Sequence, residues 1–146
     1  MSKKNDNLIF RAESKTDLIT PFFMDSVSAG FPSPATDYIE EDIDLNVHLI
    51  KNVPATFIIR VQGKSMSNVG IYDGDLLVVD KSLNPKNFST VIANVHDELV
   101  VKSFVKHEGK KFLTSGSKEF EDRILINEEE DVFIWGVVTY VIHSTY

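Results

Sequence analysis

The sequence predicts a mainly β protein, with a single twisted, partly closed β-barrel-like domain, an extended N-terminal arm and one short helix. Three observations support this fold class. From Ala55 onward, apolar residues recur at every second position, which is typical of half-buried strands. Turn-forming pairs such as Asp73-Gly74 and His96-Asp97 separate the apolar runs. The 146 residues, 42% of them hydrophobic, suffice for one compact domain with its own core.

The chain begins with an arm that changes character along its length. Residues 1–15 are polar apart from one short apolar run, and we assign them no role. Residues 16–29 carry so many large apolar side chains that we expect this part to dock on the folded domain. Residues 29–35 read AGFPSPA, and Pro32 and Pro34 favour extended backbone at and before each proline. This stretch is therefore either an ordinary linker or a peptide that something binds.

One helix is predicted just after the prolines, within residues 37–52. The segment has an acidic start, with Asp42 or Asp44 as possible N-caps. Its apolar residues follow at spacings of three and four, namely Ile39, Ile43, Val47 and Ile50.

Seven strands are predicted in the remainder of the chain. Gly136 lies inside the longest of them, where we expect a bulge or bend. The segments are ATFIIRVQG, DLLVVD, STVIANV, ELVVKSFVK, KKFLTSG, RILI and DVFIWGVVTYVIH. The acidic run at residues 126–131 is interpreted as a solvated hairpin face, and Trp135 as a core or dimer contact.

Composition excludes several classes of function. Acidic side chains outnumber basic ones 22 to 15, so direct sequence-specific DNA binding is disfavoured. The absence of cysteine removes disulfides, thiolate metal sites and cysteine nucleophiles, and it fits a cytoplasmic location. No apolar run is long enough for a membrane span, and no signal peptide is evident. We expect neither a metal nor a cofactor, because no pair of histidines has metal-ligand spacing among His48, His96, His107 and His143.

Two residues suggest covalent chemistry. Ser65 follows a strand in the turn GKSM, and Lys102 lies inside an apolar strand. Each residue also has an ordinary interpretation. Ser65 could be a common serine at the end of a strand, and Lys102 could extend its amine to solvent from an edge strand. Together they could form a Ser-Lys dyad, because a lysine held neutral by apolar surroundings can take the proton of a serine nucleophile. The N–H of Ser65 and a neighbouring N–H could then stabilise an oxyanion.

A Ser-His-Asp triad is disfavoured. No GxSxG motif occurs, and His96 and Asp97 are better explained as a polar hairpin turn.

Four motifs resemble the LexA/UmuD family of self-cleaving SOS-response serine peptidases, and in particular its UmuD-type members, and the match as a whole covers roughly residues 17–146. They are AGFPSPATDYIEEDIDLN at 29–46, GKSMSNVGIYDGDLLVVD at 63–80, ELVVKSF at 98–104 and DVFIWGVVTYVI at 131–142. The order and separation of the motifs also fit that family, including the 37-residue interval from Ser65 to Lys102.

The resemblance implies a function and a set of site residues. Ser65 would be the nucleophile, Lys102 the general base, and the Ala29-Gly30 bond the substrate. Cleavage would remove residues 1–29 as the arm and leave residues 30–146 as the β-rich peptidase and dimerisation domain. A RecA filament on single-stranded DNA would stimulate the reaction. The product would be a homodimer that serves a UmuC-type Y-family polymerase as accessory subunit in error-prone translesion synthesis, with no membrane involved.

Two departures and two alternatives accompany this interpretation. Ala29 stands where the best-known UmuD-type proteins have cysteine, and the 29 residues before Gly30 are too few for a DNA-binding domain, which needs roughly 60. The alternatives are a non-cleaving interaction module of the same fold, or a LexA-like repressor fragment without its DNA-binding domain. A signal-peptidase-like enzyme, which also uses Ser-Lys chemistry, is disfavoured because it would need a membrane anchor.

We also expect the arm to pack across the domain and shield part of the polymerase-binding surface.

Overall fold

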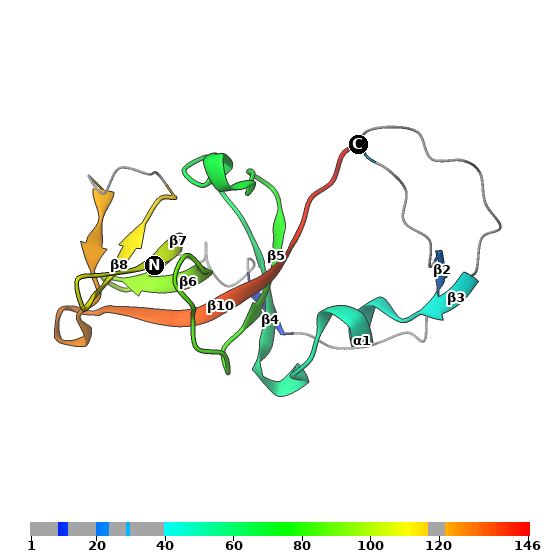
Figure 1. Cartoon of the computed structure of the whole chain (residues 1–146), viewed down its shortest axis with the longest axis horizontal. Coiled ribbons are helices and arrows are strands. Elements are labelled where there is room, and N and C mark those ends of the chain that lie inside the picture. The colour runs from blue at the N-terminus through cyan, green and yellow to red at the C-terminus, as the bar shows by residue number, and fades with distance from the viewer. Residues whose placement is uncertain (1–8, 12–19, 24–28, 30–39, 117–121) are drawn as a thin grey trace, which may run out of the picture.

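A computed structural model describes residues 9–11, 20–23, 29, 40–116 and 122–146, and it confirms the mainly β class (Figure 1). Strands dominate, and the α-helix α1 is short. In chain order the elements are β1 (Ile9–Arg11), β2 (Thr20–Phe23), β3 (Glu40–Ile43), α1 (Leu45–Leu49), β4 (Thr56–Arg60), β5 (Leu76–Asp80), β6 (Thr90–Val95), β7 (Glu98–His107), β8 (Lys110–Thr114), β9 (Ile124–Leu125) and β10 (Val132–Ile142). The single-turn 3₁₀ helices that lie wholly within the described residues are η1 (Val53–Ala55), η2 (Ser67–Val69) and η4 (Glu128–Glu130).

Eight strands form one antiparallel sheet in the order β1-β4-β5-β10-β6-β7-β8-β9. Its end strands, β1 and β9, do not pair with each other, so the sheet stays open. All seven strands predicted from the alternating pattern are present, β4 to β10. The arm adds more strands than its sequence indicates, because β1 pairs with β4 and β2 pairs with β3 in a separate two-stranded sheet.

The predicted helix is present but shorter than its apolar spacing indicates. Asp44 is the N-cap, and its side chain accepts the backbone N–H groups of Asn46 and Val47 at 2.9 and 3.4 Å. Asp42, the other candidate cap, lies in β3 opposite Pro21. The acidic start therefore pairs as a strand, and the helix begins only after it. No helix in the described part of the chain is long and apolar enough to cross a membrane.

One predicted turn and one predicted bulge shape the sheet. His96 and Asp97 join β6 to β7 with φ of 50° and 68°, the left-handed conformation that a two-residue hairpin turn requires. Gly136 lies at a register shift of β10 against β6, which confirms the predicted bulge. A Cβ atom there would come within 2.6 Å of the Val79 side chain, so only glycine fits without movement.

The core has two clusters of buried side chains, and alternate residues of β6 belong to different clusters. The first includes Met66, Leu77 and Ile92, and the second includes Phe104 and Leu113. Burial of these side chains supplies the main stabilisation of the domain.

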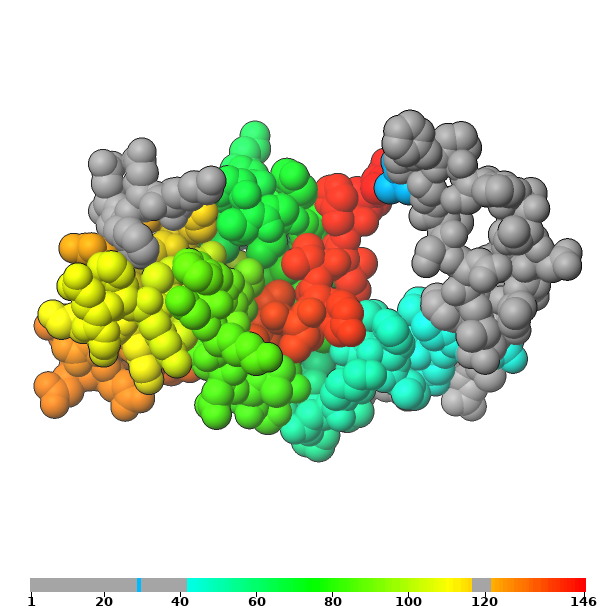
Figure 2. Space-filling view, in the orientation of Figure 1, coloured from blue at the N-terminus to red at the C-terminus, as the bar shows by residue number. Residues whose placement is uncertain are grey.

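The structure also describes Trp135, the helix α1 and the acidic turn. Trp135 packs against the first core cluster, 5.2 Å from the Phe57 ring and 4.6 Å from Lys81 Nζ. The helix α1 lies beside the second half of β10 in Figure 2, and the rings of His48 and Tyr140 are 6.2 Å apart. The three glutamates of η4 are exposed, as the interpretation of a solvated acidic turn requires.

The C-terminal end of β10 is held by a buried carboxylate. Asp75 is 3% exposed; one carboxylate oxygen accepts the backbone N–H of Tyr72 at 2.8 Å, and the other lies 2.6 Å from His143 Nδ1. The hydrogen bond from Tyr72 is the main cause that lowers the pKa of Asp75 below its usual value. Burial opposes this shift, and the hydrogen bond and charge of His143 add to it.

This lowered pKa predicts acid-sensitive stability. A carboxyl group with a lowered folded-state pKa stabilises the fold above its unfolded value of about 3.9 and loses that contribution as the pH falls further. The Asp75→Asn variant should therefore melt at a lower temperature than the wild type at neutral pH, with a smaller difference near pH 3. Thermal melting across this pH range checks the expectation, with Glu129→Gln as the exposed control. A constant difference at every pH would contradict it.

Candidate active site

Ser65 lies on a turn that is anchored on both sides. Before it, Gly63 adopts a φ of 96° and donates its N–H to Asp73 Oδ1 at 2.7 Å. After it, Met66 is only 2% exposed, and its side chain belongs to the first core cluster. Ser65 itself is exposed. The buried methionine therefore fixes the turn while the serine hydroxyl stays accessible.

The same turn leaves two backbone donors available. Among the described residues, neither the N–H of Ser65 nor that of Met66 has a hydrogen-bond acceptor, whereas the next N–H, that of Ser67, donates to the Lys64 carbonyl at 3.2 Å. Adjacent free N–H groups beside a nucleophile are what an oxyanion site needs. This pair fits the sequence-based expectation for these donors.

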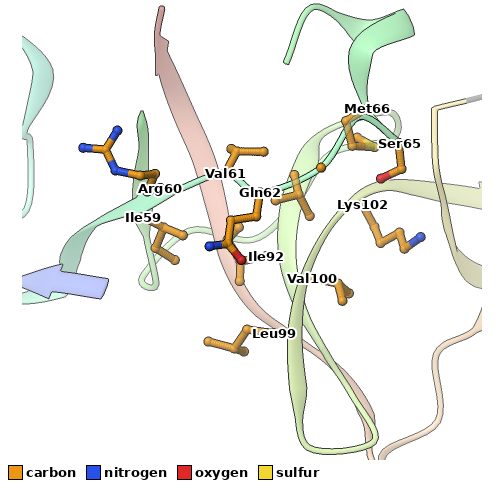
Figure 3. A pocket seen from close by; sticks show the side chains of 12 residues that line it. Ile59, Arg60, Val61, Gln62, Ser65, Met66, Ile92, Leu99, Val100 and Lys102 are labelled. Carbon is orange, nitrogen blue, oxygen red and sulfur yellow. The ribbon is translucent and has the colours of Figure 1, made fainter. Parts of the chain in front are cut away.

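Lys102 faces the same pocket as Ser65. It lies in the middle of β7 opposite Val91 of β6, and its side chain is half-buried. Figure 3 shows Ser65 and Lys102 close to each other above an apolar floor. The pocket has a volume of about 270 Å³ and is lined by Ile59, Arg60, Val61, Gln62, Gly63, Ser65, Met66, Ile92, Leu99, Val100, Val101 and Lys102. The structure thus brings together two residues that are distant in the sequence.

The amine of Lys102 is directed away from Ser65 (Figure 3). Lys102 Nζ donates to Ser115 Oγ at 2.9 Å, and no hydrogen bond joins Lys102 to Ser65 in the described structure. The backbone N–H of Ser115 in turn donates to Asp122 Oδ2 at 2.9 Å. The lysine is therefore the first member of a short polar chain that leads out of the pocket.

The pKa of Asp122 lies below its usual value in this arrangement. The hydrogen bond from the Ser115 hydroxyl is the main cause that lowers the pKa of Asp122. Partial desolvation opposes the shift, and the Ser115 backbone N–H and the charge of Lys102 lower the pKa further. Ser115 therefore links the two charged residues, because its hydroxyl oxygen accepts from Lys102 while its backbone N–H donates to Asp122.

Sequence reasoning did not identify Ser115 or Asp122. The antiparallel register pairs Ser103 of β7 with Thr114 of β8, so Ser115 comes beside Lys102 only through long-range pairing. A serine and an aspartate in a polar loop carry no signal of their own.

The predicted cleavage site is described only in part. Ala29 is exposed and does not line the pocket, while Gly30 and residues 31–39 lie outside the described residues. His96 and Asp97 occupy the β6–β7 turn and are not among the pocket residues either. In the described ranges, no group of three or more His, Asp or Glu side chains is arranged to hold a metal ion.

This fold and pocket agree with the comparisons with known proteins. Residues 21–139 match the Peptidase S24-like family, so the chain belongs to that family of peptidases. It is 43% identical over 127 residues to the protein ImpA of Escherichia coli, covering 87% of this chain and 86% of ImpA. It is 39% identical over 120 residues to the protein MucA of E. coli, with 82% of each chain covered.

The repressor branch of the family matches as well. The LexA repressor of Providencia rettgeri is 35% identical over 119 residues, which are 82% of this chain and 58% of the repressor. The LexA/UmuD resemblance seen in the motifs is thereby confirmed. The comparisons also confirm the predicted class of function, which is that of a UmuD-like protein of SOS mutagenesis.

Proposed function

We propose that this protein cleaves its own Ala29-Gly30 bond, with Ser65 as nucleophile and Lys102 as general base. The observation that carries the proposal is the single pocket in which an exposed serine on an anchored turn meets a half-buried strand lysine. Membership of a peptidase family supports the same chemistry.

The reaction would follow the usual course of serine acyl transfer. Neutral Lys102 takes the hydroxyl proton of Ser65 as Oγ attacks the Ala29 carbonyl carbon, and the free N–H groups of Ser65 and Met66 stabilise the oxyanion. The lysine then gives its proton to the Gly30 nitrogen, and the C–N bond breaks. Water, deprotonated by the same lysine, hydrolyses the Ala29 ester and restores Ser65.

Cleavage requires the arm to reach the pocket, because Ala29 does not line it. The arm of the same chain or that of a second copy could supply the bond. We propose that a RecA filament on single-stranded DNA favours this engaged arrangement and so stimulates the reaction.

The product would then act in translesion synthesis. Residues 30–146 would form a homodimer and join a UmuC-type Y-family polymerase as accessory subunit in error-prone synthesis. The similarity to ImpA and MucA over most of both chains supports this role.

A direct assay tests the proposal. The purified full chain is incubated from about pH 7 to about pH 10, with and without RecA, ATP and single-stranded DNA, and is followed by intact mass. We expect a product that begins at Gly30. It should form faster with the filament, and without it the rate should rise with pH, because a lysine accepts a proton only when neutral. An unchanged mass under all conditions would instead favour the non-cleaving interaction module.

A further inference from the structure

The hydrogen bond between Lys102 and Ser115 raises a question about the resting state of the proposed dyad. A general base must present its lone pair to the nucleophile. Here the Lys102 amine instead donates to Ser115 Oγ at 2.9 Å and points away from the Ser65 hydroxyl (Figure 3). The contact therefore competes with the contact that catalysis needs.

The charge on Asp122 acts in the same direction. Asp122 accepts the backbone N–H of Ser115 at 2.9 Å, and the side chain of Ser115 and the charge of Lys102 both contribute to its lowered pKa. The Asp122 carboxylate and the Lys102 charge attract each other, which favours the position of the amine beside Ser115. Arg60 is the other charged residue lining the pocket, but its guanidinium donates to the Gly74 carbonyl at 3.0 Å.

We propose that Ser115 and Asp122 are positioning residues that hold the Lys102 amine turned away from Ser65, and so restrain self-cleavage until the chain is activated. This inference rests on the proposed Ser65-Lys102 chemistry. Activation would then have to release the amine from Ser115 and turn it toward Ser65. The restraint is local, since β7 and β8 already place Lys102 and Ser115 side by side.

The first test measures RecA-independent cleavage against pH in wild type, Asp122→Asn and Ser115→Ala. We expect Asp122→Asn to cleave about 3- to 10-fold faster near neutral pH, because the amine loses the attraction that keeps it beside Ser115. Ser115→Ala should also cleave faster than the wild type. Glu130→Gln, which removes an exposed charge from η4, is the matched control and should behave as wild type. Slower cleavage by both variants, or an unchanged profile, would overturn the restraint.

The second test does not depend on cleavage. In the Ser65→Ala background, the rate at which an amine-directed acylating reagent modifies Lys102 is measured by peptide mass spectrometry, because an amine held beside Ser115 is less available to the reagent. Adding Asp122→Asn should raise this rate about 3- to 10-fold near neutral pH, and adding Glu130→Gln should not. An equal rate with and without the Asp122 carboxylate would overturn the inference, even if the protein never cleaves itself. Failure of the proposed function would appear differently, as a wild type that stays intact at every pH.

Discussion

Replacing Ser65 with alanine should abolish self-cleavage, by a factor of at least about 10³, both at alkaline pH and with the RecA filament. The substitution removes the atom that forms the acyl bond, and no other group can replace it in that turn. Because Ser65 is exposed and its neighbour Met66 supplies the buried anchor, the fold should be unaffected. Intact mass measures the cleavage, and thermal melting confirms that the variant is folded.

Lys102→Ala should have an effect of similar size, since the serine would lose its base. The chain offers a matched control for each substitution. Ser67 is an exposed serine in the adjoining 3₁₀ turn, and Lys106 is an exposed lysine on the same strand β7. Ser67→Ala and Lys106→Ala should cleave at the wild-type rate. Persistent cleavage by Ser65→Ala or by Lys102→Ala would remove that residue from the proposed dyad.

The parts of the fold that the sequence predicts well are those with local signals. β4 to β10 show the alternation of a half-buried strand, and the His96-Asp97 turn and the Gly136 bulge lie where turn and bend residues interrupt it. The strands β1 to β3 lack such signals. Glu40–Ile43 is acidic and carries helix-like spacing, and only its pairing with β2 makes it a strand. These strands form through long-range pairing, which the local sequence pattern does not predict.

The candidate site shows the same division. Ser65 and Lys102 stand out because a lysine within an apolar strand is unusual, and the shared pocket follows once β4, β6 and β7 are in one sheet. Ser115 and Asp122 become significant only through the register of β8 against β7. The Asp75–His143 pair spans 68 positions in the sequence and likewise depends on tertiary structure. Residues whose role depends on a partner far away in the sequence cannot be recognised from the local pattern of a single sequence.

Cleavage after Ala29 would also change the main sheet, because the released segment contains β1. This strand pairs with β4 through Ile9 opposite Ile59, Phe10 opposite Ile58 and Arg11 opposite Phe57. On its other side β4 pairs with β5, so β4 becomes the end strand of the sheet once β1 is lost. An unpaired edge presents free backbone N–H and C=O groups that can bind another strand. Removal of the arm would thus uncover a surface that the uncleaved chain covers.

We therefore expect hydrogen exchange to distinguish the two forms of the protein. Backbone amides of β4 that face β1 should exchange at least about tenfold faster in the cleaved product than in uncleaved Ser65→Ala protein, because they lose their acceptors. Amides of β6 are the internal control, since this strand lies between β10 and β7 and should keep its protection in both forms. Equal exchange of β4 in the two forms would show that the arm does not cover this edge in solution. The shielding role of the arm would then have to be abandoned, whereas the Ser65-Lys102 chemistry would stand on the cleavage assay alone.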